Sequence, residues 1–148
     1  MDAACRYLSY RPRSEFEMRV WLRRKEFPPG VVDSTISALK SRGLVDDVAF
    51  ARYWRESRDS GSPRSRAALK SELARKGVDP DVVSAALDSA DDVAAAYRAV
   101  QKRAARLAGS DYGEFRNRLG AALRRRGFSY EVTECTVKRL WQESRSNG

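Results

Sequence analysis

Histidine is absent from the 148-residue chain, and cysteine occurs only twice, as Cys5 and Cys135. The lack of histidine removes the commonest general base and the commonest metal ligand, so an enzyme and a metalloprotein are the least favoured classes. The two cysteines match no metal-binding or redox spacing, and we expect both to be buried or half-buried in a reducing compartment. The sequence therefore offers no catalytic residue and no metal ligand.

Long apolar runs are also absent, because no stretch approaches the roughly 20 residues of a membrane span. The first residues, Met1–Cys5, lack the basic and apolar regions of a signal peptide. No segment shows the strict alternation of a half-buried strand, and no glycine-rich phosphate loop or zinc spacing occurs. With 42% hydrophobic and 33% charged residues, the sequence predicts a globular cytoplasmic protein without a membrane span.

A short motif occurs three times, at residues 22–27, 73–78 and 123–128. Each copy has a leucine, then basic residues, then a residue that ends a helix, and finally an apolar residue. Further apolar residues recur at fixed distances from each leucine, with the spacing of two helical faces joined by a turn. The alternative is that the recurrence is a coincidence, but too many apolar positions keep the same distance from the leucine in all three copies. They are Met18, Leu69 and Leu119; Val31, Val82 and Val132; Ile36, Leu87 and Val137; and Leu39, Ala90 and Leu140.

This period of about 50 residues divides the chain into units 1–44, 45–90 and 91–148. The predicted fold class is all-α, with three tandem three-helix, helix-turn-helix-like repeats. A unit of this size is marginally stable alone, so the three units either share one core or stack on one another.

Residues that begin and end helices agree with this division. Ser14 and Ser65 stand at equivalent positions as N-caps, and Gly77 stands at a predicted helix end. Glu26 replaces that glycine in the first copy, so we expect Pro28, Pro29 and Gly30 to form the first turn. The pairs Asp46-Asp47 and Asp91-Asp92 each precede a helix, and capping explains them better than metal binding does.

Three further expectations concern single segments. Residues 58–63 have the composition of a loop. A long helix after Asp92 carries a predicted buried stripe that begins at Val93 and ends at Leu107. The tail over residues 144–148 is expected to fray. The aromatics Trp21, Tyr53, Trp54, Tyr97 and Trp141 have core-like spacing, so packing is favoured over stacking on nucleic-acid bases.

The net charge of +9 is distributed unevenly along the chain. Residues 1–44 carry a balance of +4, residues 45–90 are neutral, and residues 91–148 carry +5. A basic protein is drawn to polyanions such as nucleic acid, an acidic membrane surface or an acidic protein face. The uneven balance indicates that the end units and the middle unit have different roles.

The basic residues form three groups of candidate binding residues. Cations in the last turn of a helix also favour its negative end, but three in a row exceed that requirement. A basic stripe on a helix is usually a solvated face, and this alternative stays open for the long helix. The candidates are Arg23, Arg24 and Lys25; Arg98, Lys102 and Arg106; and Arg116, Arg118, Arg124, Arg125 and Arg126.

Three stretches resemble the RecX regulatory family over nearly the whole chain. They are Arg11-Pro12-Arg13-Ser14 before an apolar helix, Leu44-Val45-Asp46-Asp47-Val48-Ala49-Phe50-Ala51, and the turn Arg75-Lys76-Gly77-Val78. The second stretch is the most specific of the three. Many relatives carry an extension before the first helix, whereas this sequence begins almost at that helix.

The resemblance implies three tandem three-helix repeats in an elongated, curved array. It also implies a bacterial cytoplasmic regulator of the RecA recombinase that acts in DNA repair and the SOS response and needs no cofactor. Such a protein binds the RecA–DNA filament in its groove, and restrains ATP hydrolysis, strand exchange and co-protease activity. The implied partners are the RecA filament and single- or double-stranded DNA associated with it, and the protein is expected to be a monomer. An autonomous nucleic-acid-binding helical-repeat protein and a purely structural scaffold are the alternatives.

Overall fold

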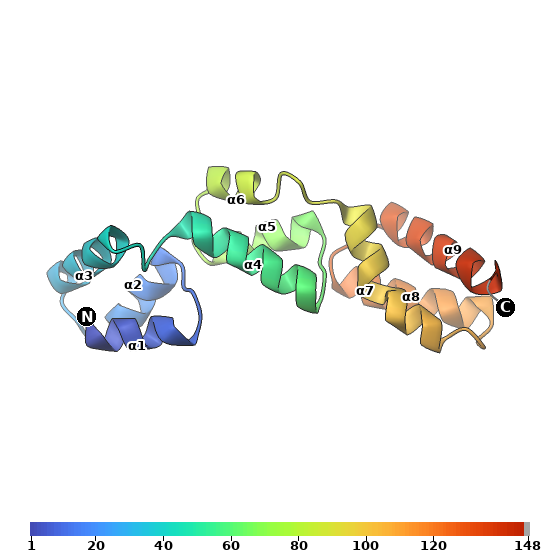
Figure 1. Cartoon of the computed structure of the whole chain (residues 1–148), viewed down its shortest axis with the longest axis horizontal. Helices are drawn as coiled ribbons and strands as arrows, with labels where there is room; N and C mark the ends of the chain where they lie inside the picture. The colour runs from blue at the N-terminus through green and yellow to red at the C-terminus, as the bar shows by residue number, and fades with distance from the viewer. Residues whose placement is uncertain (147–148) are drawn as a thin grey trace. The chain divides into compact units, whose positions relative to one another are not determined.

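The computed structural model describes residues 1–146, and over this range it contains helices and no strand (Figure 1). This confirms the all-α prediction, with helices in three consecutive groups of three. No helix within that range is long and apolar enough to cross a bilayer. The helices are α1 (Asp2–Tyr10), α2 (Glu15–Arg24), α3 (Pro29–Ser41), α4 (Asp47–Gly61), α5 (Arg66–Arg75), α6 (Pro80–Ala86), α7 (Asp92–Arg106), α8 (Tyr112–Arg125) and α9 (Tyr130–Ser146).

Two compact units make up the chain. One contains residues 1–56 and 70–88, and the other contains residues 57–69 and 89–148. Helices α4 and α5 therefore contribute residues to both units. The repeat boundaries after residues 44 and 90 stay a proposal.

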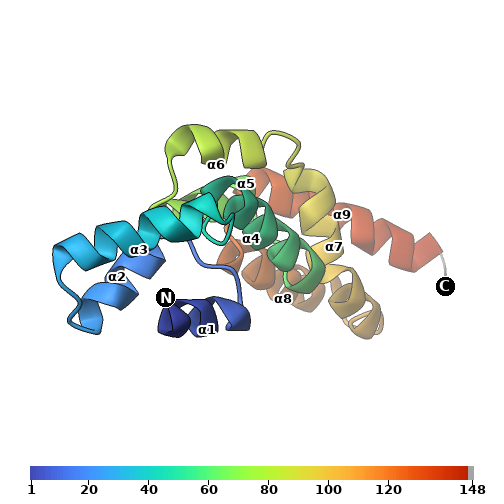
Figure 2. The same cartoon turned by 60° about the vertical axis from the view of Figure 1, so that its left-hand side comes forward.

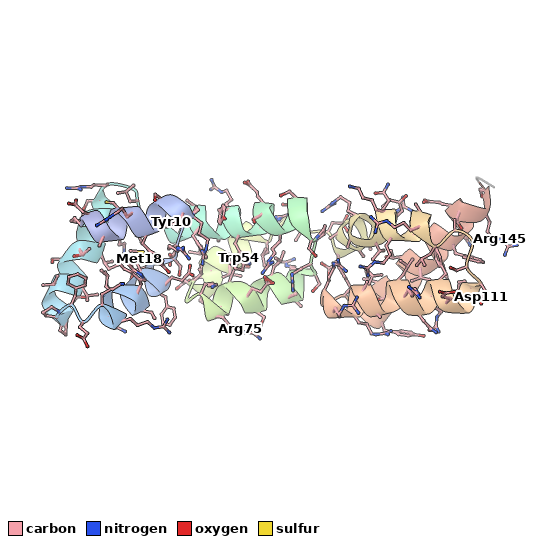
Figure 3. All side chains as sticks on the ribbon, turned by 90° about the horizontal axis from the view of Figure 1, so that it is seen from below. Tyr10, Met18, Trp54, Arg75, Asp111 and Arg145 are labelled. Atoms are coloured by element: carbon pink, nitrogen blue, oxygen red, sulfur yellow. The ribbon has the colours of Figure 1, made fainter. Side chains whose placement is uncertain are left out.

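The core of the first unit lies between α1, α2 and α3, which are grouped together in both views (Figure 1 and Figure 2). Met18 and Leu22 of α2 pack against Ile36 and Leu39 of α3, and Ala4 joins them from α1. Met18 is fully buried and points into this cluster (Figure 3). These residues hold the register predicted from the repeat, because their spacing places them on facing stripes of the helices.

The core of the second unit lies where α7 packs against α8 and α9. Phe115, Leu119 and Leu123 of α8 are fully buried there, together with Val137 of α9. The predicted stripe of α7 is confirmed at Val100 and Ala104, which are buried, and at Tyr97 and Leu107, which pack against the core, but Val93 is 47% exposed. Ala95 and Ala96 complete the buried face, and their small side chains allow close helix contact.

The threefold sequence motif forms the same helix end each time. Phe27, Val78 and Phe128 donate backbone hydrogen bonds to the carbonyls of Leu22, Leu73 and Leu123, at 3.4, 3.2 and 3.1 Å. The preceding residue takes positive φ in every copy, which completes a Schellman motif. Glu26 adopts this conformation itself, with φ of 65°, so the prediction that Pro28, Pro29 and Gly30 replace the missing glycine was wrong.

Each of the two capping serines also contacts the helix end of the following repeat. Ser14 Oγ accepts from the Glu17 N–H at 3.1 Å and donates to the Lys76 carbonyl at 2.6 Å. Ser65 Oγ accepts from the Ala68 N–H, and its own N–H donates to the Arg126 carbonyl, both at 3.0 Å. The predicted N-caps are confirmed, and each one also joins two repeats.

In each of the pairs Asp46-Asp47 and Asp91-Asp92, the first aspartate caps its own helix and the second accepts a hydrogen bond from an earlier helix. Asp46 and Asp91 accept from the first N–H groups of their own helices. Asp47 Oδ1 accepts from the N–H of Glu15 at 2.9 Å, and Asp92 Oδ1 accepts from the N–H of Arg66 at 2.8 Å. Burial raises the pKa of Asp47, although this hydrogen bond acts in the opposite direction. Capping is therefore confirmed, and it extends across the repeat junction.

Several local predictions need correction. Helix α4 continues to Gly61 through most of the predicted loop over 58–63, and Ser60 Oγ donates to the Ser57 carbonyl at 3.4 Å in a helical pattern. Cys135 is exposed on α9, whereas Cys5 is half-buried as predicted. Phe27 and Val31, which the repeat places on the apolar helical faces, are about two-fifths exposed. Val32, the residue after Val31, is buried instead. Helix α9 includes residues 144–146 of the predicted frayed tail, and residues 147–148 lie outside the described part.

Candidate binding site at the basic helix ends

The first basic cluster lies in the last turn of α2. Arg23, Arg24 and Lys25 are all exposed, and within the described residues none forms an ion pair. Lys25 Nζ lies 5.6 Å from the centre of the Trp21 ring, at cation–π distance. The three cations therefore face solvent together at the end of α2.

In the corresponding turn of the second repeat, one basic side chain is exposed and the other contacts neighbouring side chains. Arg75 is exposed on the outer side of α5 (Figure 3). Lys76 is half-buried, and its Nζ lies 3.3 Å from Glu17 Oε2 and 5.3 Å from the Trp54 ring centre. Neither Arg75 nor Lys76 is among the binding residues predicted from the sequence.

The three arginines at the end of α8 do not share one environment. Arg124 and Arg125 are exposed, whereas Arg126 is half-buried. Arg126 Nε donates to Ser62 Oγ at 2.9 Å, and its Nη1 donates to the Ala122 carbonyl at 3.1 Å. Arg126 therefore helps to join two repeats, while its two neighbours face outward.

Further arginines surround Arg126. Burial lowers the pKa of the Arg126 guanidinium, and repulsion from the charges of Arg103, Arg125 and Arg64 lowers it further. Arg64 and Arg103 were not among the predicted site residues. The only signal for Arg64 was the repeated Pro-Arg-Ser sequence, and Arg103 lies off the predicted stripe of α7. Arg64, Arg103 and Arg125 therefore all lie near enough to Arg126 for their charges to act on it.

The remaining predicted residues fall into two kinds. Arg98, Lys102 and Arg106 are exposed on α7, as the i, i+4, i+8 spacing predicts. Arg116 and Arg118 are instead paired with carboxylates, Arg116 Nη2 with Glu134 at 2.9 Å and Arg118 Nε with Glu114 at 3.2 Å. Their charges are locally balanced, which makes them weaker candidates for binding a polyanion.

The predicted packing role of the aromatics is only partly fulfilled. Trp21, Tyr97 and Trp141 pack against the two cores, but each is half-buried and keeps an exposed edge. Tyr53 and Trp54 are also half-buried, and the Trp54 indole N–H donates to Glu72 Oε1 at 3.1 Å. Residues 1–146 contain no group of three histidine, cysteine or acidic side chains arranged to hold a metal ion.

The fold and these surfaces define a class of protein. It is an all-helical repeat protein whose helix ends present exposed clusters of cations, which suits an anionic partner. Its three repeats match known domains in order: residues 1–39, 46–87 and 90–135 match the sequence profiles of the first, second and third three-helix domains of RecX. The chain belongs to the RecX family.

Similar proteins agree with this assignment. The chain is 34% identical over 139 residues to the regulatory protein RecX of Chlorobium limicola, covering 94% of this chain and 87% of that protein. It is 38% identical over 136 residues to the regulatory protein RecX of Mycobacterium ulcerans, covering 89% and 78%. The crystal structure of RecX from Lactobacillus salivarius has a TM-score of 0.74 at 25% identity, covering 94% of this chain and 92% of that one.

Proposed function

We propose that this protein binds the RecA–DNA filament and restrains its ATP hydrolysis, strand exchange and co-protease activity. The observation that carries the proposal is the match of all three repeats, in order, to the three domains of RecX. The relatives are named regulatory proteins, which supports a role in controlling another protein. On this proposal the protein acts in the cytoplasm, as a monomer without a cofactor, in the control of recombination, DNA repair and the SOS response.

The exposed cations supply a physical basis for filament binding. A filament of RecA on DNA presents acidic protein surface and DNA phosphates to a protein in its groove. The end turns of α2 and α8 offer Arg23, Arg24 and Lys25 in one repeat, and Arg124 and Arg125 in another. These side chains are exposed at helix ends, so they can meet anionic groups without first breaking ion pairs of their own.

A binding measurement separates this proposal from the alternative of an autonomous nucleic-acid-binding protein. Fluorescently labelled protein would be titrated with RecA filaments on single-stranded DNA and, separately, with the same DNA alone. A filament regulator binds the filament more tightly than bare DNA at physiological salt. Equal or tighter binding to bare DNA, with affinity falling steeply as salt rises, would favour the autonomous binder.

A further inference from the structure

A stacked aromatic pair forms the centre of a surface on the first unit. The rings of Tyr7 in α1 and Trp21 in α2 lie 4.5 Å apart and within 5° of parallel. Both residues are half-buried against the first core. The Arg13 guanidinium lies 4.0 Å from the Tyr7 ring centre, so the pair is already in contact with cations.

Two grooves flank this pair, and both combine aromatic and basic side chains. The larger, of about 430 Å³, adds Arg6, Tyr10, Lys25 and Phe27 to the stacked rings. The smaller, of about 190 Å³, adds Phe16, Arg24, Arg75 and Lys76 to the same two rings. Tyr7 and Trp21 line both grooves, so the two form one surface.

The aromatic rings at the edges of this surface are accessible. Tyr10 is 83% exposed, Phe16 is 48% exposed and Phe27 is 40% exposed. Three exposed rings beside a stacked pair are more than core packing requires, since the buried residues of the cluster between α1, α2 and α3 include no aromatic side chain. Their free faces can accept another flat ring.

The charge of the surface is strongly positive. Arg6, Arg24, Lys25 and Arg75 are exposed, and none of them forms an ion pair among the described residues. The one carboxylate that lines either groove is Glu17, and it is neutralised by Arg11 at 2.6 Å and Lys76 at 3.3 Å. The occupant should therefore be anionic as well as aromatic.

We propose that this surface binds single-stranded nucleic acid, with bases stacked on Tyr10, Phe27 and the Tyr7–Trp21 pair and with phosphates beside Arg24 and Lys25. Unpaired bases stack readily on exposed aromatic side chains, and a neighbouring row of cations follows the backbone. A duplex keeps its bases stacked on one another and gains only the phosphate contacts. The surface therefore prefers single strands, and it does so without RecA, so the inference does not depend on the proposed regulatory function.

The test is the affinity of the full chain for a fluorescent deoxythymidine oligomer of about 15 nucleotides, measured by anisotropy without RecA. The variant Tyr10→Ala with Phe27→Ala should weaken binding about tenfold or more, because it removes two stacking platforms. Tyr130→Ala is the matched control, since Tyr130 is 70% exposed on another helix. The conservative variant Tyr10→Trp with Phe27→Trp should restore binding, which a merely structural effect would not do.

A second pair of variants tests the phosphate contacts. Arg24→Gln with Lys25→Gln should reduce the dependence of log affinity on log salt by about 0.7 per charge. Lys70→Gln with Lys138→Gln, two exposed lysines elsewhere, is the control.

Two outcomes would overturn the proposal. If Tyr10→Ala with Phe27→Ala binds the oligomer as tightly as the unmodified chain, the rings do not stack on bases, and a partner protein becomes the better occupant. If the unmodified chain prefers the duplex of the same length, the surface does not recognise single strands. Both results concern the chain and DNA without RecA, whereas filament binding is measured with RecA present, so the failure of one proposal can be told from the failure of the other.

Discussion

Ser14 Oγ donates a hydrogen bond to the backbone carbonyl of Lys76, 2.6 Å away and 62 residues later in the chain. The same hydroxyl accepts from the N–H of Glu17, and the Ser14 side chain is fully buried. One side chain thus begins α2 and holds the end of α5. Ser65 also caps its helix through Oγ and contacts the next helix end, but there its backbone N–H, rather than its side chain, donates to the Arg126 carbonyl at 3.0 Å.

Replacing Ser14 by alanine should lower the free energy of unfolding by about 2–3 kcal/mol. The change removes an N-cap and leaves the Lys76 carbonyl without its hydrogen bond, and these two effects add. Ser34→Ala is the control, because Ser34 is exposed on α3 and bonds only within its own helix. Urea unfolding followed by circular dichroism measures both, and equal stabilities for the two variants would contradict the proposed role of Ser14.

Two glycines with the same backbone conformation should respond differently to alanine. Gly77 and Gly43 have φ of 74° and 71°, so alanine strains both by about 1–2 kcal/mol. A Cβ on Gly77 would also overlap Phe16, whereas a Cβ on Gly43 meets nothing within 4 Å. Gly77→Ala should therefore cost about 1–3 kcal/mol more than Gly43→Ala, as overpacking does. Similar unfolding midpoints for both would show that close packing at Gly77 is unimportant.

Glu26 should gain from the opposite substitution. It occupies the left-handed region that Gly77 and Gly127 occupy in the other repeats. Glu26→Gly relieves this strain but makes the unfolded chain more flexible, so we expect a net stabilisation of up to about 1 kcal/mol. A loss of stability in thermal unfolding would mean that the Glu26 side chain makes a favourable contribution that outweighs its strain.

Glu17 should make stability depend on pH. Burial raises its pKa, but hydrogen bonds from Arg11 and the Ser14 N–H, with the charges of Arg11 and Lys76, outweigh burial, so the pKa is lowered below 4.5. A carboxyl group with a lowered pKa in the folded state stabilises the protein above its unfolded pKa, and loses this effect as pH falls through the folded pKa.

The variant Glu17→Gln should accordingly be about 1 kcal/mol less stable than the unmodified chain near neutral pH, with the difference shrinking as the pH falls below 4.5. Urea unfolding across this pH range measures the difference. Glu131→Gln, at an exposed position on α9, should show no such trend. A difference that stays constant with pH would rule out the charge of Glu17 as its source.

The arginines at the end of α8 should separate into binding and structural residues. Arg124→Glu with Arg125→Glu should weaken filament binding at least several-fold and leave the helical circular dichroism unchanged, because both side chains are exposed. Arg126→Ala should instead lower stability by about 1–2 kcal/mol, since it removes the hydrogen bond to Ser62. Unchanged filament binding after the double reversal would remove Arg124 and Arg125 from the interface.

Much of the fold could be predicted from the sequence because its signals are local. The leucine, basic turn, helix stop and apolar residue belong to a single helix end, and Ser14 and Asp91 cap the helices that follow them directly. Each of these features depends on residues only a few positions apart. Periodicity alone then placed Met18, Ile36 and Leu39 in the core.

The features that the sequence could not predict depend on distant residues. Arg126 looks like Arg124 and Arg125 in the sequence, and only the approach of Ser62 and Ser65 makes it half-buried. Residues 58–61 have the composition of a loop, but α4 continues through them to Gly61. Glu26 can take the place of glycine because it is exposed, whereas Gly77 lies against Phe16 and Gly127 lies against Ser65 and Ala68. A single repeat viewed alone does not reveal this difference.

The proposal that this protein regulates the RecA filament is tested most directly by ATP hydrolysis. The rate of single-strand-dependent ATP hydrolysis by RecA would be measured as this protein is added. We expect inhibition that saturates at or below the concentration of RecA, with a weaker effect from the Arg124→Glu, Arg125→Glu variant. Inhibition far below that concentration would indicate binding at filament ends, and inhibition near stoichiometry would indicate binding along the groove. Unchanged hydrolysis at every concentration, together with tight binding to bare DNA, would contradict the account.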